Sequence, residues 1–509
     1  MKLNQIKVLT QDEIEFIHRS SLELIEKVGI KIDDDKTRRL FHEYGAEVDN
    51  NNNFVKIPES LIKEKLKQTP SSFRLFGPDG TYNIEISTNN IHFAPIGAAV
   101  KIFDPSSTNN IRKSILKDTV KQLRIVDQLD HLSCSQIDFW PGDVKYTTIH
   151  AVCIYNWAKN SHKPYGHGCF GRTVSEDSIK MTAIIAGGEE EIIKHPRLFG
   201  IFNPTSPLHL PKIMTNGLDV FAKYKQPTVI APEALAGTSA PITIAGLLTQ
   251  TNAEILSGIV LAQLYNPGTP VFYGSVSHIT DMRTGNSAIG SIETGLITAG
   301  IAQLANFYKI PSRALGGVTD SKCLDLQNGI ERFQTLMFAA LSGINFITFA
   351  GTYEATLAGA LELTIIDNEI AGMIKRALQG INVNDATIGL QSIENVTKSK
   401  IKGTSFLSEK HTRDFMKREI FIPQLMDRNR RTTWRKKGSK DLVKIAAEKI
   451  RDLLQNYNEY ELPKDIDEEL KNYMKVIDKR TYDDYAKLEG ISSSRITLPN
   501  GKEIVSKDK

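Results

Sequence analysis

Polar and aromatic side chains recur in this sequence shortly after short apolar runs. Residues 138–140 (Asp-Phe-Trp) follow one such run, Glu233 follows a second, and residues 353–354 (Tyr-Glu) follow a third. Aromatic rings together with a few carboxylates suit a cation that cannot donate strong hydrogen bonds, such as a methylated ammonium. The residues that we predict to bind such a substrate are Asp138, Phe139, Trp140, His167, Glu233, Tyr353 and Glu354.

The same positions after apolar runs supply candidates for catalysis. Histidine changes its charge near neutral pH, so His278, His167 and His411 could act as acids or bases, or could equally orient a neighbour by hydrogen bonding. His278 or Asn203 could also bind a carboxylate or hydroxyl of the substrate. We assign the catalytic positions to His278, Asn203 and Asp320.

Other interpretations of these residues stay open. The rings of Phe139, Phe170 and Phe349 could simply cover the core. Lys322 could form a Schiff base, although the carboxylates that flank it would hold it protonated. Cysteines near the runs could join a glutamate in a zinc site, although their spacing gives no specific support. The alternatives are therefore a zinc- or lysine-dependent enzyme on another small molecule, or a protein that binds a methylated amine without turnover.

The apolar runs are the elements that must position these side chains. Each run is too short for a helix and too continuous for a half-exposed strand, which is typical of a strand buried on both faces of a parallel sheet. Helical stretches separate the runs, as parallel strands require. Seven runs lie at 132–137, 164–170, 198–202, 228–231, 271–274, 311–316 and 344–349, and we place an eighth near 404–407, ending at His411.

About eight strand–helix repeats predict an α/β fold, a (β/α)8 TIM barrel whose chemistry lies at the C-terminal ends of the strands. We expect an N-terminal α+β extension over residues 1–116, the barrel over 117–437 and a C-terminal helical tail over 438–509. Residues 10–13 (Thr-Gln-Asp-Glu) predict a capped start of the first helix. The tail helices are charged and amphipathic, and we interpret them as a packing or oligomer element of a homo-oligomer.

Composition and motifs argue against several classes of protein. A formal net charge of +4 over 509 residues is small, and its basic residues cluster locally, which gives no general case for nucleic-acid binding. No window reaches the ~18 apolar residues of a membrane span, so we expect a cytoplasmic protein with no membrane partner. No glycine-rich phosphate loop follows a strand, which argues against a nucleotide cofactor. The four cysteines are far apart, which argues against a disulfide framework.

Four groups of short motifs occur in order along the chain. They are residues 44–48 (Tyr-Gly-Ala-Glu-Val), residues 317–322 (Gly-Val-Thr-Asp-Ser-Lys) with Asp325 and Gln327, residues 366–369 (Ile-Asp-Asn-Glu), and residues 411–412 (His-Thr) leading to 421–423 (Phe-Ile-Pro) and 427–428 (Asp-Arg). Each motif is weak alone, but their order and spacing together are fairly specific. Through these motifs the chain resembles the trimethylamine methyltransferase family, a group of corrinoid-protein methyltransferases. The resemblance covers nearly all of the chain up to about residue 437.

The resemblance implies a (β/α) barrel that moves a methyl group from a methylated amine to the Co(I) of a separate, cognate corrinoid protein docked over the barrel mouth. It implies no cofactor held tightly by this chain. Founding members of the family carry pyrrolysine inside the barrel, and this sequence departs from them because it has none. Relatives without pyrrolysine act on quaternary amines such as glycine betaine. A quaternary ammonium already carries its charge and expels a neutral amine, whereas a tertiary amine must first be activated, so we expect a quaternary substrate.

Within this resemblance we expect the candidate residues to divide their roles. Phe139, Trp140 and Tyr353 would surround the cationic head, and Asp138 and Glu233 would offset its charge. This chain would hold the cation dry and aligned, while the partner's cofactor would carry the chemistry.

Overall fold

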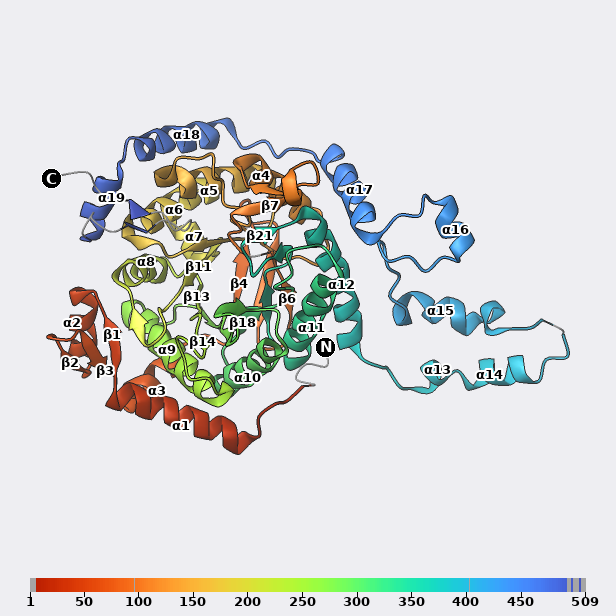
Figure 1. Cartoon of the computed structure of the whole chain (residues 1–509), viewed down its shortest axis with the longest axis horizontal. Helices are drawn as coiled ribbons and strands as arrows, with labels where there is room; N and C mark the ends of the chain where they lie inside the picture. Colours follow the sequence, from red (N-terminus) through yellow and green to blue (C-terminus); the bar gives the residue numbers. More distant parts are fainter. Residues whose placement is uncertain (1–5, 96, 402, 492–495, 498–502, 505–509) are drawn as a thin grey trace.

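Eight short parallel strands form the centre of the computed structural model, with helices around them (Figure 1). The structure describes residues 6–95, 97–401, 403–491, 496–497 and 503–504. In sheet order the strands are β6 (His92–Phe93), β19 (Phe346–Thr348), β18 (Ser312–Leu315), β15 (Val271–Gly274), β13 (Thr228–Ile230), β11 (Leu198–Phe202), β10 (Tyr165–Gly168) and β9 (Ser135–Gln136). All neighbouring strands pair in parallel, and the seven strands expected between residues 132 and 349 are confirmed.

The two ends of this sheet meet through β6 and the residues just before β9. Phe93 forms a parallel bridge with Leu132, and the carbonyl of Phe93 accepts a hydrogen bond from the Ser133 amide at 2.7 Å. The curled parallel sheet confirms the expected barrel fold class.

The eighth strand is β6, so the prediction of a strand near 404–407 is wrong. Phe406–Ser408 forms a 3₁₀ turn outside the barrel, and Leu407 is 84% exposed there. A short apolar run does not reveal by itself whether its side chains are buried. The true strand is only two residues long and lies close before Pro95, in the segment that we assigned to the N-terminal extension.

Each barrel strand is followed in the chain by a helix on the outside of the barrel. These helices are α4 (Leu116–Asp127), α5 (Ile149–Asn160), α6 (Gly171–Ala186), α8 (Lys212–Lys223), α9 (Ile244–Tyr265), α10 (Ile292–Tyr308), α11 (Leu326–Ser342) and α12 (Leu361–Gln379), with the short α7 (Glu189–Lys194) after α6. Side-chain caps fix several helix starts. The Asp325 carboxylate, for example, accepts the Asn328 amide at 3.0 Å and begins α11, and Gly343 ends it in the left-handed region at φ +92°.

Helix α9 is apolar on nearly all sides. Its length and composition would let it cross a membrane, yet 78% of its most apolar window is buried inside the protein. The barrel covers one side of α9, while α1 (Gln11–Lys27) and α3 (Glu59–Gln68) pack on it from outside. A helix enclosed in this way has no hydrophilic face to maintain.

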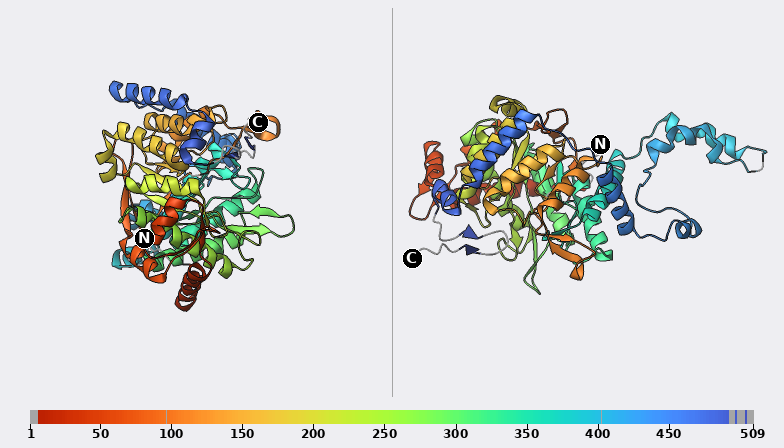
Figure 2. Two further views of the ribbon diagram at one scale, coloured as in Figure 1. Left: turned by 90° about the vertical axis from the view of Figure 1, so that its left-hand side faces the viewer. Right: turned by 90° about the horizontal axis from the view of Figure 1, so that it is seen from above.

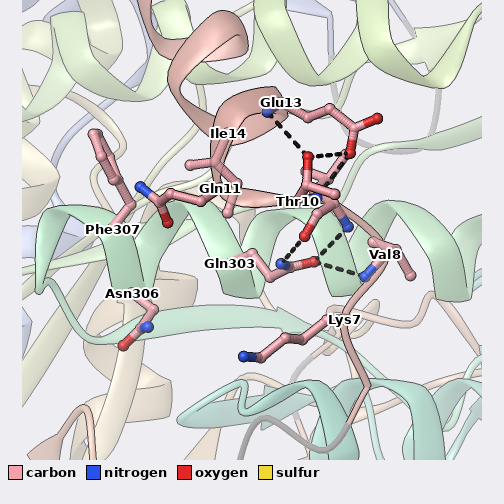
Figure 3. A pocket seen from close by; sticks show the side chains of 10 residues that line it. Lys7, Val8, Thr10, Gln11, Glu13, Ile14, Gln303, Asn306 and Phe307 are labelled. Carbon is pink, nitrogen blue, oxygen red and sulfur yellow. Dashed lines mark hydrogen bonds between the residues drawn. The ribbon is translucent and has the colours of Figure 1, made fainter.

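The N-terminal segment packs against the helices of the barrel. It contains α1, α2 (Asp35–Glu43) and α3, and its strands β1 (Ile30–Ile32), β3 (Phe54–Lys56) and β2 (Glu47–Asp49) form a sheet with β12 (His209–Leu210). The predicted capping box of α1 is confirmed, because the Thr10 amide donates to the Glu13 carboxylate at 2.7 Å and Thr10 Oγ1 accepts the Glu13 amide (Figure 3). On α10, the Gln303 side chain accepts the backbone amides of Val8 and Leu9 and so anchors this entry to the barrel.

The N-terminal end of the barrel is closed by aromatic side chains. Phe199, Phe272 and Phe346 cluster inside it, with ring centroids 5.3 to 6.4 Å apart. The hairpin of β4 (Ser72–Phe76) and β5 (Asn83–Ser87) covers this end, and its Phe73 ring meets that of Phe272 at 5.0 Å. The barrel therefore has a packed interior below its C-terminal end.

Loops with short strands of their own lie beyond the C-terminal ends of the barrel strands. One small sheet contains β7 (Lys101–Phe103), β8 (Ile111–Lys113), β20 (Thr352–Tyr353) and β21 (Ala358–Gly359), and another contains β14 (Leu235–Ala236), β16 (His278–Asp281) and β17 (Asn286–Ala288). These loops form the walls around the barrel mouth.

After α12 the chain leaves the barrel as an arm over residues 380–437, which contains α13 (Asp385–Ile388), α14 (Leu390–Thr397), α15 (Lys410–Glu419) and α16 (Arg431–Lys436). The arm projects from the body in both figures (Figures 1 and 2). The tail then returns, with α17 (Leu442–Gln455) on α12 and α4, and with α18 (Lys464–Asp478) and α19 (Tyr482–Glu489) on α6. The tail helices therefore pack on the chain's own barrel, and a short pair, β22 (Ile496–Thr497) and β23 (Glu503–Ile504), follows them.

Candidate functional site

A pocket of about 320 Å³ lies at the C-terminal ends of the barrel strands. This volume is at the small end of the ~300–1,000 Å³ typical of small-molecule sites. Each of the eight strands contributes a residue at its end or shortly beyond it. The lining residues are Gly97, Ala98, Val100, Gln136, Ile137, Trp140, Gly166, His167, Gly168, Phe170, Ile201, Asn203, Glu233, Val276, Arg313, Phe349, Thr356 and Leu357.

Four of the predicted site residues line this pocket: Trp140, His167, Asn203 and Glu233. The ring of Trp140 contacts the ring of Tyr146, with the two ring centroids 5.9 Å apart. The Asn203 amide donates to the Ala231 carbonyl at 2.7 Å, which fixes its orientation after β11. Glu233 is exposed at the rim, so its carboxylate remains solvated beside the opening.

The His167 ring is neutral in this setting. Its Nδ1 donates to the Gly168 carbonyl at 3.0 Å, so the lone pair of the neutral ring is on Nε2. Burial, together with repulsion from His150, lowers the pKa of His167 to about 4. The His167 ring meets the Phe170 ring edge to face at 6.2 Å. A neutral imidazole next to a ring adds polarity to the wall without repelling a bound cation.

Asp138 and Phe139 lie behind the pocket wall. Both line a separate void of about 10 Å³ that also touches Gln122 and Thr364. The Asp138 carboxyl is buried, and neither of its oxygens has a hydrogen-bond partner. Burial raises the pKa of Asp138 well above its usual range, and the nearby Gln122 amide opposes this only in part. Burial thus favours the protonated form of Asp138, and this residue is outside the lining of the barrel pocket.

The remaining predicted residues belong to the loops around the mouth and are absent from the pocket lining. Both ring nitrogens of His278 are engaged, since Nδ1 donates to the Val276 carbonyl at 2.8 Å and Nε2 contacts Ser287 Oγ at 2.6 Å. The Asp320 carboxylate accepts the backbone amides of Ile289 and Gly290 at 3.1 and 2.9 Å. These contacts position the loops beside the barrel mouth.

Tyr353 and Glu354 are also held within the loop layer. Burial of the Tyr353 ring raises the pKa of its hydroxyl to about 12. The Glu354 carboxylate pairs with Lys101 Nζ at 3.1 Å. His411 lies in α15 of the arm, where its ring contacts Phe415. None of these three residues reaches the pocket lining.

Arg313 and Phe349 line the pocket although we did not place them in the predicted site. Arg313 comes from β18, a strand buried at every position, and its own exposed fraction is 3%. The guanidinium carbon lies 5.1 Å from the centroid of the Phe349 ring. Burial lowers the pKa of Arg313 to about 10, against the attraction of Glu233, so the group is still charged at neutral pH. A charged residue inside an apolar parallel strand was the available signal, because such burial is costly without a partner.

A buried ion pair joins the loop that carries Phe349 to the neighbouring loop after β18. Arg332 Nη1 donates to the Asp367 carboxylate and to the Gly317 carbonyl, both at 2.6 Å, and Asp367 also accepts the Gly351 amide at 2.6 Å. The pair thus joins the loop after β18 to the loop after β19. Phe349 itself has a left-handed backbone at φ +84°, which a non-glycine residue adopts only when its surroundings impose it.

The positions of the cysteines and of Lys322 do not support the alternative of a zinc- or lysine-dependent enzyme. The described residues contain no cluster of three or more His, Cys, Asp or Glu side chains that could hold a metal ion. Cys134, Cys153 and Cys169 are buried thiols, and burial raises the pKa of each. Lys322 donates to the Asp320 carbonyl at 2.7 Å on the exposed surface, outside the pocket.

A second cavity, of about 610 Å³, is larger than the barrel pocket but lies elsewhere. It is bounded by residues 7–14 of the entry segment and by Gln303, Asn306 and Phe307 of α10 (Figure 3). The polar groups of Gln303 are bonded to the backbone of Val8 and Leu9. This cavity is a gap between packed elements, far from the strand ends where chemistry is placed in this fold.

Comparison with known proteins places this architecture in a family. The family model described as trimethylamine methyltransferase (MTTB) matches residues 1–482. A glycine betaine methyltransferase of Desulfitobacterium hafniense is 34% identical over 475 residues, covering 93% of this chain and 97% of the relative. The trimethylamine methyltransferase MttB of Methanosarcina barkeri is 34% identical over 484 residues, covering 93% and 95%.

Among solved structures, the hydroxylamine complex of MtmB covers 89% of this chain and 96% of its own, at 14% identity and a TM-score of 0.47. The matches in sequence extend over the N-terminal segment, the barrel and most of the tail. The chain therefore belongs to the trimethylamine methyltransferase family.

Proposed function

We propose that this chain binds a quaternary methylated amine in the barrel pocket and presents one of its methyl groups to the Co(I) of a separate corrinoid protein. The observation that carries the proposal is the lining of the 320 Å³ pocket, which combines the rings of Trp140, Phe170 and Phe349 with the Glu233 carboxylate. Relatives named glycine betaine methyltransferase and trimethylamine methyltransferase support the same class of substrate.

The lining suits a cation that has no N–H to donate. Ring faces attract such a cation through their quadrupole, and a carboxylate at the rim adds long-range attraction. Neutral His167 adds no repulsion, and Arg313 is the one cationic side chain among the described lining residues. A primary ammonium would instead need several acceptors within hydrogen-bond reach.

The chemistry of the transfer would come from the partner's corrinoid, whose Co(I) supplies the electron pair that bonds the methyl carbon while the C–N pair stays with nitrogen. This chain's residues would hold the donor nitrogen and exclude water from it. The leaving amine departs neutral, so no side chain of this protein has to supply a proton. Phe170 is 41% exposed and Glu233 is exposed at the rim, which leaves the pocket accessible from outside.

A methyl-transfer assay tests this proposal. Purified protein is mixed with a reduced corrinoid protein, or with free Co(I) cobalamin, and with glycine betaine, carnitine, choline, tetramethylammonium or trimethylamine. Loss of Co(I) absorbance and formation of the demethylated amine are followed together. We expect transfer from a quaternary compound and none from trimethylamine.

Two single-residue variants test whether the reaction takes place in the barrel pocket. Glu233→Gln removes the rim carboxylate and should weaken binding of every quaternary ligand in the panel. Asp281→Asn removes a carboxylate from β16, outside the pocket lining, and should behave as the wild type. Equal loss in both variants, or no transfer from any quaternary amine, would count against the proposal.

We also propose that the chain forms a homo-oligomer in solution, as expected from its sequence. The support comes from the arm, where Val383, Leu390, Ile401 and Leu407 are each more than 70% exposed. Helices α13, α15 and α16 bury none of their own residues. Light scattering of the wild type and of a Leu390→Glu/Leu407→Glu variant tests this, and a monomeric wild type would overturn it.

A further inference from the structure

We infer that the ligand of the barrel pocket is a zwitterion and that Arg313 binds its carboxylate. The inference rests on the proposed function, because it names the class of quaternary amine that the same pocket takes. It makes Arg313 a residue that determines specificity.

The Arg313 guanidinium is a buried cation without an acceptor in the part of the chain that the structure describes. Its side chain forms no hydrogen bond and no ion pair with any residue that the structure describes, and its Nη1 is fully enclosed. Buried polar groups in folded proteins are nearly always bonded, and a buried charge without a partner is costly. Arg313 lines the pocket, so an acceptor placed in the pocket would remove this cost.

A second buried arginine in the same region shows what a structural role requires. Arg332 is 1% exposed, and its guanidinium donates to the Gly317 and Thr352 carbonyls and to the Asp367 and Asn328 side chains. Every guanidinium nitrogen of Arg332 therefore has an acceptor, whereas Arg313 has none among the described residues, although both side chains are almost fully enclosed. The difference between the two arginines indicates that Arg313 binds an anionic group of a ligand.

The surroundings of Arg313 leave a defined place for that group. The Phe349 ring lies along one side of the guanidinium, with the guanidinium carbon 5.1 Å from its centroid. Phe349 reaches this position from a backbone at φ +84°, which the ion pair of Arg332 and Asp367 supports through the neighbouring Gly351. The edge of a guanidinium carries its N–H donors in a fork that matches a carboxylate.

The pocket contains one charge of each sign, and they are not paired with each other. Glu233 attracts Arg313 at long range, but no ion pair joins the two side chains among the described residues. Arg313 is almost fully enclosed, whereas Glu233 is exposed at the rim. A ligand with a carboxylate at its inner end and a quaternary ammonium at its outer end complements both groups.

This arrangement also orients the reacting methyl group. With the carboxylate held at Arg313, the ammonium extends toward Trp140 and Phe170 and its methyl groups face the opening. The volume of about 320 Å³ accommodates a small N-methylated amino acid, a betaine. Choline and tetramethylammonium have the cation without the anchor, so they would bind without this orientation.

Calorimetry with matched ligands tests the inference. Glycine betaine and its primary amide have nearly the same shape and differ in the carboxylate charge. We expect wild-type protein to bind glycine betaine roughly 10-fold to 100-fold more tightly than the amide, as for hydrogen bonds to a charged group. Arg313→Gln should remove this difference, and Arg313→Lys should keep part of it because it retains the charge without the fork.

Two controls separate this inference from the proposed function. Arg283→Gln removes an exposed arginine from the turn between β16 and β17 and should preserve the preference for the carboxylate. Tetramethylammonium binding by Arg313→Gln reports whether the rest of the pocket is intact. If wild-type protein binds the amide as tightly as glycine betaine, the inference is wrong while the proposed function stands. If no quaternary ligand binds at all, the proposed function fails.

Discussion

The guanidinium of Arg313 and the ring of Phe349 lie against each other at the barrel mouth, 5.1 Å from guanidinium carbon to ring centroid. They come from adjacent strands, β18 and β19, and both line the pocket. The ring shields the cation from water on one side without neutralising it. The pocket therefore presents an enclosed positive charge that remains available to an anionic ligand.

Replacing Phe349 by leucine should weaken ligand binding while leaving the fold intact. The substitution keeps an apolar side chain at a strained backbone position and removes the π face beside Arg313. Without the ring the guanidinium loses its fixed position, and ordering one such side chain on binding costs roughly 0.5–1.5 kcal/mol, which predicts a roughly 2-fold to 10-fold increase in Kd for a betaine. Calorimetry measures this, and an unchanged Kd would show that the ring does not order the guanidinium.

Asp138→Asn should leave ligand binding near neutral pH unchanged. Burial raises the pKa of Asp138 well above its usual range, so the protonated side chain persists to a higher pH than in an unfolded chain. An amide of the same shape would then reproduce it. A large loss of affinity in this variant would mean that an ionised Asp138 faces the ligand.

The same substitution should change how stability depends on pH. The folded protein retains the Asp138 proton to a higher pH than the unfolded chain does, so this group's contribution to stability is full below the unfolded pKa of about 3.9 and is lost as pH rises toward the folded pKa. Asp138→Asn removes that loss, so its Tm relative to wild type should rise as the pH increases above the unfolded pKa. Asp118→Asn, which breaks a bidentate pair with Arg112, should lower Tm at neutral pH instead.

Asp367→Asn should destabilise the protein strongly. The substitution leaves Arg332 as a buried charge with a weakened partner, which typically costs about 3–5 kcal/mol. Glu354→Gln breaks the partly exposed pair with Lys101 and should cost less than about 1 kcal/mol. Denaturant unfolding of the two variants distinguishes the two cases, and similar losses would contradict the role given to the buried pair.

The C-terminal tail should stabilise the rim of the pocket. The Glu489 carboxylate accepts the backbone amides of Arg172 and Thr173 at 2.9 and 2.7 Å, at the start of α6 and directly after Phe170. Glu489→Ala removes this cap and should lower stability by about 1–2 kcal/mol. Hydrogen exchange should show faster opening of the first turn of α6, and exchange equal to wild type would show that the tail does not support the rim.

Much of the fold was predictable because each barrel strand is buried on both faces. Such strands appear in the sequence as continuous apolar runs between helical stretches, and seven of the eight were found in this way. Strand β6 was missed because it lies in the segment assigned to the N-terminal extension, far in sequence from β19, with which it pairs in the closed sheet. The capping box of α1 was predictable because Thr10 and Glu13 are local partners.

The pocket was predictable only in part because its lining depends on which way each side chain turns. Trp140, His167, Asn203 and Glu233 were found as residues that follow strands. The sequence could not reveal that the side chains of Asp138 and Phe139 point behind the pocket wall. In an irregular segment, the order of residues along the chain does not determine the direction in which each side chain points. Arg313 was overlooked because it lies within a strand, where charge is rare, although that rarity was the clue.

The most direct measurement is a crystal structure of the protein with glycine betaine. We predict the ligand in the barrel pocket, with its carboxylate within hydrogen-bond distance of Arg313 and its trimethylammonium group between Trp140, Phe170 and the rim. At least one methyl group should face the opening. Ligand density in the cavity beside Gln303, or an ammonium group buried at Arg313 with the carboxylate outward, would contradict the central claim.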